Sequence, residues 1–375
     1  MIPESENISV EFKSAQVRPE SVARAMVAFS NTYGGTLYIG VEDDGSVSGL
    51  DEGRKWDEWA ANIARNAINP AISPKISVEL EGEKRILRID VEKGKNKPYQ
   101  TLGDGKYWIR VASTVRIATQ QELSRLFQAA GMLHYDISPV EGSCMDDLNE
   151  RRLISYFKNI YKIDYIAEAD KPRLLKNASL LAELDGKDVA TVGGLLQFSF
   201  FADRFLPQAT ISIAVIKGTD ISDDVVQKKE IAGPLTDQID AAVSFMRLFT
   251  PEPLVVKDSP RREDTLAIPL DVMRETVVNA VAHRDYSILT RKIHIYIYSD
   301  RIEVQSPGRL ANTLSLEMLP YGNSAPRNIF LVKLLDNMNY IDGLGRGIPL
   351  IVRKMGKRVH FTENGELFCV RLDFA

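Results

Sequence analysis

Two patterns in the last third of the chain place polar side chains and glycines where they could form a binding site. Glu275 and Asn279 lie four residues apart in Leu270–Val281, whose apolar spacing predicts a helix, so both side chains project from the same helical face. Farther along, a glycine-rich turn precedes Pro349, which suits the first turn of a helix. Such a turn exposes backbone N–H groups to phosphate. The predicted phosphate-binding loop is Gly343-Leu344-Gly345-Arg346-Gly347.

A second candidate site is the basic stretch Lys84–Arg116. Nine basic and three acidic residues give it a net charge of +6 over 33 residues, and aromatic residues are interleaved. Such a stretch could follow a phosphate backbone and stack bases. The alternative is the solvated face of a hairpin. The nucleic-acid contacts predicted here are Lys93, Lys95, Lys97 and Arg110.

The elements that position these residues alternate between helical and strand patterns at the amino-terminal end. They predict an α+β domain over residues 1–135, followed by a linker at Ile137–Cys144 with Pro139 and Gly142. The expected helices are Ser21–Ser30, Asp57–Asn69 and Gln120–Ala130, and the expected strands are Thr36–Val41, Lys75–Leu80, Arg85–Val91 and Lys106–Val111.

The remainder of the chain predicts a mixed middle α+β segment, 145–255, and a carboxy-terminal domain, 260–375. The middle segment is expected to contain the helices Leu148–Tyr161 and Leu235–Leu248, the strand Ala209–Lys217 and an apolar stretch, Thr191–Phe201. After Leu270–Val281, the last domain is expected to contain paired strands at Lys292–Ser299 and Arg301–Gln305, helices near Asn328–Asn337 and Pro349–Met355, and a strand at Leu367–Leu372.

Three amino-terminal motifs, in this order and spacing, resemble the Schlafen AlbA-like domain. They are Glu6-Asn7-Ile8-Ser9-Val10-Glu11-Phe12-Lys13, then Ala28-Phe29-Ser30-Asn31-Thr32-Tyr33-Gly34-Gly35, then Ile39-Gly40-Val41-Glu42-Asp43-Asp44-Gly45. The resemblance covers about residues 1–130 and implies that the first and third motifs are neighbouring strands of one sheet. It also implies a nucleic-acid-binding regulator, the role usually given to bacterial members.

Some Schlafen proteins instead cut RNA with two glutamates and a third carboxylate. By position, the resemblance assigns these roles to Glu6, Glu11 and either Glu42 or Asp43, with Glu11 as a metal ligand. Clustered carboxylates can hold divalent metals that activate water and neutralise a leaving oxyanion. A spacing of five places Glu6 and Glu11 on opposite faces of a continuous strand, so convergence requires a turn after Glu6. A metal-dependent nuclease, for instance one used in defence, is therefore an alternative function.

The carboxy-terminal patterns together resemble the GHKL, or Bergerat-fold, ATPase module, an α/β sandwich, in the variant found in helicase-related bacterial regulators. The resemblance spans about residues 265–375 and includes His283-Arg284-Asp285-Tyr286 and Arg327-Asn328. It implies that Glu275 polarises the attacking water, that Asn279 ligates Mg²⁺, and that Gly343, Gly345 and Gly347 bind the phosphates of ATP. Where the family has an aspartate-glycine box that reads the adenine amino group, this chain has Gln305-Ser306-Pro307-Gly308.

Composition excludes several classes of protein. No apolar stretch approaches the roughly 20 residues that span a bilayer, and two distant cysteines, Cys144 and Cys369, do not predict a disulfide framework or zinc site. We expect a soluble cytoplasmic protein without membrane partners. No Walker A lysine motif supports a helicase motor. A transcriptional regulator that binds nucleic acid and ATP, forming a homo-oligomer, is the favoured hypothesis; an oligomeric interaction protein with a degenerate nucleotide pocket is a further alternative.

Overall fold

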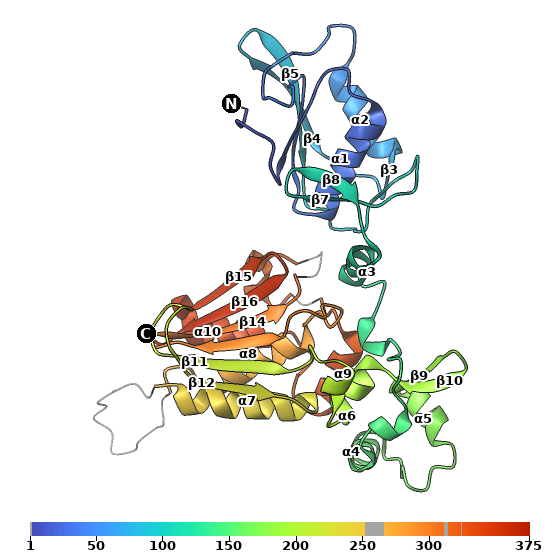
Figure 1. The fold of residues 1–375 in the computed structure, drawn as a ribbon, viewed down its shortest axis with the longest axis vertical. Helices are drawn as coiled ribbons and strands as arrows, with labels where there is room; N and C mark the ends of the chain where they lie inside the picture. The colour runs from blue at the N-terminus through green and yellow to red at the C-terminus, as the bar shows by residue number, and fades with distance from the viewer. Residues whose placement is uncertain (1, 252–265, 311–313, 324) are drawn as a thin grey trace. The chain divides into compact units, whose positions relative to one another are not determined.

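The computed structural model describes residues 2–251, 266–310, 314–323 and 325–375. The chain divides into two compact units, of which unit 1 ends at Leu133 and unit 2 begins at His134 (Figure 1). Both units mix helices with sheets, as the α+β prediction expects. Within the described ranges, none of the helices is long and apolar enough to cross a membrane.

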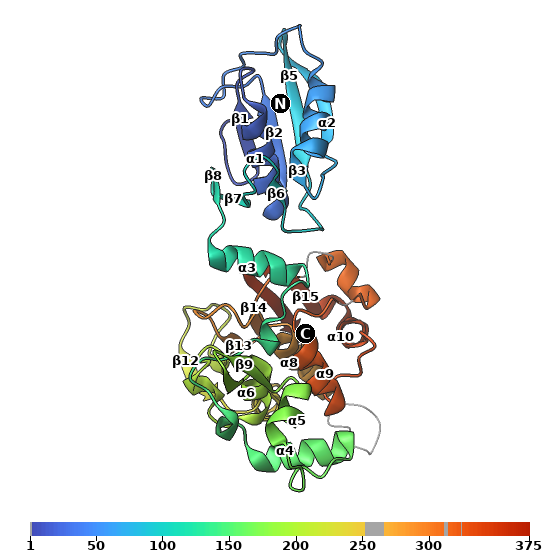
Figure 2. The ribbon, with the colours of Figure 1, turned by 90° about the vertical axis from the view of Figure 1, so that its right-hand side faces the viewer.

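Unit 1 is built on a four-stranded sheet in the order β1-β2-β5-β4. Figure 2 shows helices α1 and α2 beside this sheet, and apolar side chains of both helices pack on its strands in one core. Two small pairs, β3 with β6 and β7 with β8, complete the unit. The elements are β1 (Val10–Lys13), α1 (Pro19–Asn31), β2 (Gly35–Ile39), α2 (Trp56–Asn66), β3 (Ile68–Asn69), β4 (Lys75–Glu81), β5 (Lys84–Val91), β6 (Gln100–Thr101), β7 (Trp108–Val111), β8 (Thr114–Ile117) and α3 (Gln120–Ala129).

Strand β1 lies parallel to β2, with Glu11 opposite Leu37 and Lys13 opposite Ile39. This confirms that the first and third amino-terminal motifs form neighbouring strands. Helix α1 connects them, and its apolar face packs beneath the sheet. Gly35 is the first residue of β2. This position requires glycine, because a Cβ there would lie 2.3 Å from the Phe29 ring. The second motif, Ala28–Gly35, therefore serves first as a scaffold that fixes the two strands.

Unit 2 contains a six-stranded sheet in the order β12-β11-β13-β14-β16-β15. Strands β11 and β13 are parallel, and all other neighbours are antiparallel. The predicted pairing of the two strands after residue 290 is confirmed, with Ile295 opposite Val304. The strands are β11 (Ile211–Ile216), β12 (Val225–Ile231), β13 (Ile293–Ile297), β14 (Arg301–Pro307), β15 (Val359–Asn364) and β16 (Leu367–Asp373).

Helices α7, α8 and α10 pack on the sheet of unit 2, with α8 in contact with both α7 and α10. Alternate residues of β13, such as Ile293 and Ile295, are buried beneath them, so period-two alternation in the strand matches one covered face. The other elements flank this layer. The helices are η1 (Tyr135–Ile137), η2 (Met145–Asp147), α4 (Glu150–Tyr156), a π-helical turn η3 (Phe157–Tyr161), α5 (Lys171–Asn177), α6 (Val192–Phe198), η4 (Ala202–Arg204), α7 (Leu235–Phe249), α8 (Leu270–Ala282), η5 (Leu316–Tyr321), α9 (Ile329–Asn337), α10 (Gly347–Met355) and η6 (Gly356–Arg358), and a hairpin joins β9 (Leu181–Leu184) to β10 (Lys187–Ala190).

The amino terminus of α9 is capped by a carboxylate from a distant part of the chain. Asp136, which is fully buried in η1, accepts hydrogen bonds from the backbone N–H groups of Phe330 at 2.7 Å and Leu331 at 3.0 Å. Asn328, at the capping position, instead donates its amide to the carbonyls of Ala282, the last residue of α8, and of Arg284, just beyond it. The predicted linker therefore begins directly after a residue that is fixed in unit 2.

Replacing Asp136 with Ala should destabilise unit 2 by about 1–2 kcal/mol, because two helix-terminal N–H groups lose their acceptor. This corresponds to a decrease of about 2–8 °C in the melting temperature. Calorimetry of the full chain measures it. Asp136→Asn keeps an acceptor oxygen and should lose less stability. Equal melting temperatures for the wild type and Asp136→Ala would contradict the capping role.

Candidate functional site

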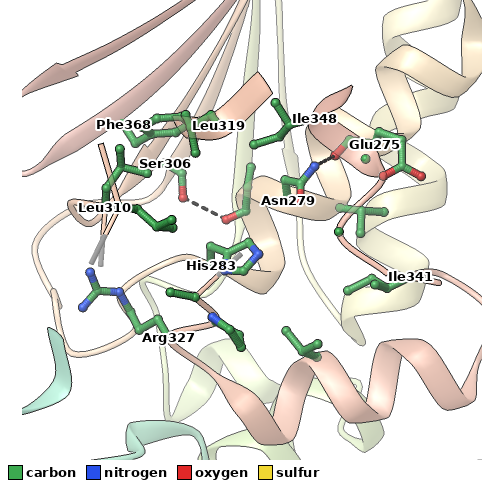
Figure 3. A pocket seen from close by; sticks show the side chains of 18 of the residues that line it. Glu275, Asn279, His283, Ser306, Leu310, Leu319, Arg327, Ile341, Ile348 and Phe368 are labelled. Carbon is green, nitrogen blue, oxygen red and sulfur yellow. Dashed lines mark hydrogen bonds between the residues drawn. The ribbon is translucent and has the colours of Figure 1, made fainter. Parts of the chain in front are cut away.

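A cavity of about 370 Å³ opens in unit 2 between α8, the end of β14 and the segment that leads into α10 (Figure 3). Its volume is in the range of small-molecule sites. Residues that are far apart in the sequence meet here. Those predicted for the nucleotide site all line the cavity, namely Glu275, Asn279, Gly343, Gly345 and Gly347.

Helix α8 presents Glu275 and Asn279 to this cavity from one face, as their spacing predicts. The Asn279 amide nitrogen donates to the Glu275 carbonyl at 2.8 Å, which fixes the side chain against its own helix. The amide oxygen makes no hydrogen bond within the part of the chain that the structure describes. It is therefore available to a ligand.

The glycine loop lies directly against this pair. Gly343 and Gly345 have φ angles of 65° and 69°, a left-handed conformation that favours glycine. At Gly347, a Cβ would lie 2.4 Å from the Glu275 Oε2 atom and 3.2 Å from the Asn279 Nδ2 atom. The loop thus reaches the functional groups of α8 only because it carries no side chain at this position, and the first N–H groups of α10 border the cavity.

Partial burial raises the pKa of Glu275 above its usual range. The positive charge of Arg274 opposes this effect, whereas the carboxylates of Asp342 and Asp271 add to it. A carboxyl whose pKa moves toward neutrality is suited to proton transfer. The site can therefore supply a general base, and that role for Glu275 stays a prediction.

His283 is a lining residue to which the sequence analysis gave no role. It follows Asn279 by four positions, so Glu275, Asn279 and His283 succeed one another along one face of α8 and its end. Burial, together with the positive charge of Arg327, lowers the pKa of His283 to about 4. The imidazole is therefore neutral near pH 7. The four-residue spacing was the signal that could have identified it.

The low pKa of His283 predicts how stability depends on pH. The unfolded chain binds a proton at His283 near pH 6.5, whereas the folded chain does so only near pH 4. The free energy of unfolding should therefore fall as the pH decreases through this window. Replacing His283 with Gln should make that decrease smaller. Denaturation at pH 5 and pH 7.5 tests this; the same difference between the two pH values in variant and wild type would contradict it.

The motif His283-Arg284-Asp285-Tyr286 and the pair Arg327-Asn328 form a buried frame beside the cavity. Arg284 donates to the carbonyls of Asp285, Ile288 and Arg291. Asp285 forms an ion pair with Arg327 at 3.1 Å. These contacts join the end of α8 to the start of α9, so most of this motif positions the cavity wall rather than contacting a ligand.

The amino-terminal carboxylates come from two segments of unit 1, one around β1 and one after β2. The chain turns between Asn7 and Val10, so Glu6 reaches back and accepts a hydrogen bond from the Phe12 N–H at 2.8 Å. This is the turn that convergence of Glu6 and Glu11 requires. Lys13 lies between the two acids, 2.9 Å from Glu11 and 3.8 Å from Glu6. Arg110 contacts the other oxygen of Glu11.

Glu42 and Asp43 lie in a turn beyond the end of β2, past the last register pair of Lys13 with Ile39. The backbone N–H of Glu42 donates to the Ser46 carbonyl at 2.8 Å, which closes the turn. In the described ranges, no three His, Cys, Asp or Glu side chains gather in a way that could hold a metal ion. The catalytic and metal roles of Glu6, Glu11, Glu42 and Asp43 stay predictions.

The predicted nucleic-acid contacts divide into exposed and buried side chains. Lys95 is exposed and Lys93 is partly exposed. Lys97 is only 3% exposed and donates to the Thr32 carbonyl, and Arg110, also 3% exposed, donates to the carbonyls of Asn7 and Val10. The last two residues therefore hold unit 1 together, and we leave them out of the proposed contact surface.

Two family models match separate parts of the chain. Residues 6–119 match the family model described as "Schlafen, AlbA_2", and residues 290–372 match that described as "Putative ATP-dependent DNA helicase recG C-terminal". The predicted resemblance to these two kinds of domain is confirmed. The second match begins after α8, so it does not include Glu275 and Asn279, and the GHKL-specific roles stay predictions.

One solved structure is similar to most of the chain, and a second is similar to part of it. The DIP2311 protein from Corynebacterium diphtheriae is 21% identical, with a TM-score of 0.48 and coverage of 98% of this chain and 75% of that chain. The N-terminal domain of a "Putative ATP-dependent DNA Helicase RecG-related Protein" from Nitrosomonas europaea is 26% identical, with a TM-score of 0.24 and coverage of 31% of this chain and 86% of that chain. No curated protein matches.

Proposed function

We propose that this chain, which carries a Schlafen AlbA_2 domain followed by a domain of the RecG carboxy-terminal family, is a nucleic-acid-binding regulator controlled by a bound nucleotide. Unit 2 binds ATP in the cavity beside α8, and unit 1 binds nucleic acid. The bound nucleotide changes the affinity for nucleic acid or the assembly of the chain into an oligomer.

One observation carries the nucleotide part of the proposal. The cavity brings the Glu275–Asn279 pair of α8 together with the glycine loop that begins almost 70 residues later in the chain. Backbone N–H groups at the start of α10 suit phosphate, and the loop glycines allow phosphate to approach the backbone.

The residues present also fit a magnesium ion bound with the nucleotide. Mg²⁺ in nucleotide sites commonly takes one or two protein oxygens and completes its octahedron with phosphate oxygens and water. The unpartnered amide oxygen of Asn279 is such a ligand. When bound, the ion would neutralise phosphate charge. Glu275, on the same face and with a raised pKa, would accept a proton from water if the nucleotide is hydrolysed.

Nucleic-acid binding is assigned to the exposed part of the basic stretch. Several of its nine basic residues are engaged within unit 1: Arg88 pairs with Asp90, Arg116 pairs with Glu122, and Lys84 donates to the Val47 carbonyl. Of the four predicted contacts, Lys93 and Lys95 are the two with exposed surface, and we take them, in the loop after β5, as the proposed phosphate contacts.

Replacing Lys93 and Lys95 with Gln should weaken nucleic-acid binding and flatten its salt dependence. Each phosphate contact contributes about 0.9 to the slope of log K against log salt on duplex DNA, so the slope should fall by up to about 1.8. Fluorescence anisotropy at several salt concentrations measures it. As a control, Lys55→Gln with Lys75→Gln removes the same charge from exposed sites elsewhere in unit 1. An unaltered slope for the Lys93 and Lys95 variant would show that these lysines only solvate a loop.

The regulatory part is tested by measuring nucleic-acid affinity and molecular mass with and without a non-hydrolysable ATP analogue and Mg²⁺. Affinity or mass that changes with the analogue supports control by the nucleotide. If the nucleotide binds but alters neither the affinity nor the mass, the chain has two independent binding activities. That result would contradict the regulatory role. The nuclease and the interaction protein with a degenerate pocket remain alternatives.

A further inference from the structure

The cavity has two chemically different ends. At one end, Glu275, Asn279 and the glycine loop offer a carboxylate, an amide and backbone N–H groups. At the other end, Leu310, Leu319 and Phe368 form apolar walls (Figure 3). Since phosphates suit the first end, the base of a nucleotide would lie between the apolar walls of the second.

Ser306 contributes a polar atom with a fixed role to the apolar end. Its hydroxyl donates a hydrogen bond to the Ala280 carbonyl at 2.8 Å. The serine is 6% exposed, and its only hydroxyl proton is committed to this bond. Toward the cavity, the Ser306 oxygen can therefore only accept a hydrogen bond.

His283 supplies the second polar group. It lies one turn of α8 beyond Ala280, the residue that holds the Ser306 hydroxyl, and Figure 3 shows its ring between Asn279 and Arg327. The ring nitrogens form no hydrogen bond with any residue that the structure describes. A neutral imidazole has one donor and one acceptor nitrogen. His283 can therefore donate to a ring nitrogen of a ligand.

The guanidinium of Arg327 is a less available donor. One terminal nitrogen donates to Asp285 at 3.1 Å, and the other donates to the Arg309 carbonyl at 2.7 Å. Among the described residues beside the apolar end, Ser306 offers an acceptor and His283 an imidazole to a base. Adenine offers a complementary edge, with an amino donor beside a ring-nitrogen acceptor.

We propose that Ser306 and His283 read the base edge of the nucleotide, with Ser306 accepting from an exocyclic amino group and His283 donating to the adjacent ring nitrogen. The proposal rests on the nucleotide binding proposed above and deepens it. A serine and a histidine would thus recognise the base in this chain, which has Gln305-Ser306-Pro307-Gly308 in place of the aspartate-glycine box.

The test compares ATP with inosine triphosphate, which carries an oxygen in place of the amino group. Isothermal titration with Mg²⁺ should show that the wild type binds ATP about 10-fold more tightly, since one net hydrogen bond is at stake. Ser306→Ala should reduce this ratio several-fold. His283→Phe, which keeps an aromatic ring, should weaken the binding of both nucleotides several-fold, because inosine keeps the N7 acceptor to which the imidazole donates. Thr250→Val is the control, because Thr250 is also buried and donates to a helical carbonyl at 2.8 Å, but lies outside the cavity.

The outcomes separate this inference from the proposed function. Equal binding of the two nucleotides by the wild type overturns the base-reading role and leaves nucleotide binding intact. A ratio that Ser306→Ala does not change, or an ATP affinity that His283→Phe does not change, also overturns it. If neither nucleotide binds the wild type at millimolar concentration, the proposed function fails as well. The wild-type ratio decides the matter even if a variant does not fold.

Discussion

Replacing Glu11 with Ala should lower the stability of unit 1 by about 3–5 kcal/mol, because it leaves the buried charge of Arg110 without its carboxylate. The Arg110 side chain is fully buried, and that of Glu11 is 8% exposed. Arg110 also lies over the Phe29 ring and donates to two backbone carbonyls, so it cannot turn outward without breaking the start of β1.

Tryptophan fluorescence during urea denaturation measures this effect selectively, because all three tryptophans, Trp56, Trp59 and Trp108, belong to unit 1. Asp43→Ala is the control. Asp43 is exposed, so its loss should change the free energy of unfolding by no more than about 0.5 kcal/mol. An unchanged urea midpoint for Glu11→Ala would contradict the structural role of the ion pair.

This expectation also changes how the nuclease alternative must be tested. Loss of RNA cleavage in Glu11→Ala could come from unfolding, so Glu11→Gln and Asp43→Ala must be assayed as folded proteins. Product with Mn²⁺ from the wild type but not from Glu11→Gln would support metal-dependent cleavage. Equal background from all proteins would exclude it.

Replacing Asn279 with Ala should weaken binding of an ATP analogue with Mg²⁺ by about 1.5–3 kcal/mol, the contribution of one charge-assisted contact. This is roughly a 10- to 150-fold increase in the dissociation constant. The reason is the unpartnered amide oxygen, which the bond from Asn279 to the Glu275 carbonyl holds in place. Isothermal titration measures the effect.

Asn159→Ala is the matched control, because Asn159 is exposed on the π-helical turn after α4 and lies outside the cavity. Its affinity for the analogue should equal that of the wild type. Because the contact requires Mg²⁺, the difference between Asn279→Ala and the wild type should disappear when EDTA is added. Unchanged affinity of Asn279→Ala in Mg²⁺ would remove the assignment of the site.

Sequence patterns predicted local elements well where periodicity and breakers agree. The expected helix at Leu270–Val281 corresponds to α8 at Leu270–Ala282, and the two strands after residue 290 pair as expected. The meeting of Glu275, Asn279 and the glycine loop was expected from the resemblance to the GHKL module, since the Glu275–Asn279 spacing alone does not indicate a phosphate site. The close approach of Gly347 to Glu275 and Asn279 depends on tertiary packing and could not be predicted from the sequence.

Long-range pairing and burial were beyond the sequence. Strand β11 lies before residue 255, where a boundary was expected, yet it pairs in parallel with β13 after that residue. Strand β12, with six exposed residues followed by a buried isoleucine, has no alternation that reveals a strand. Lys97 and Arg110 were expected to be surface charges. A count of basic residues cannot distinguish a solvated side chain from one that donates to a buried carbonyl.

The most direct test of the account is a crystal structure of the full chain with Mg²⁺ and a non-hydrolysable ATP analogue. We expect the phosphates at the backbone of Gly343–Gly347, the metal at the Asn279 amide oxygen, and the base between Leu319 and Phe368. A nucleotide bound elsewhere, or a cavity without nucleotide density at saturating concentration, would contradict the central claim that this cavity of unit 2 is a nucleotide site.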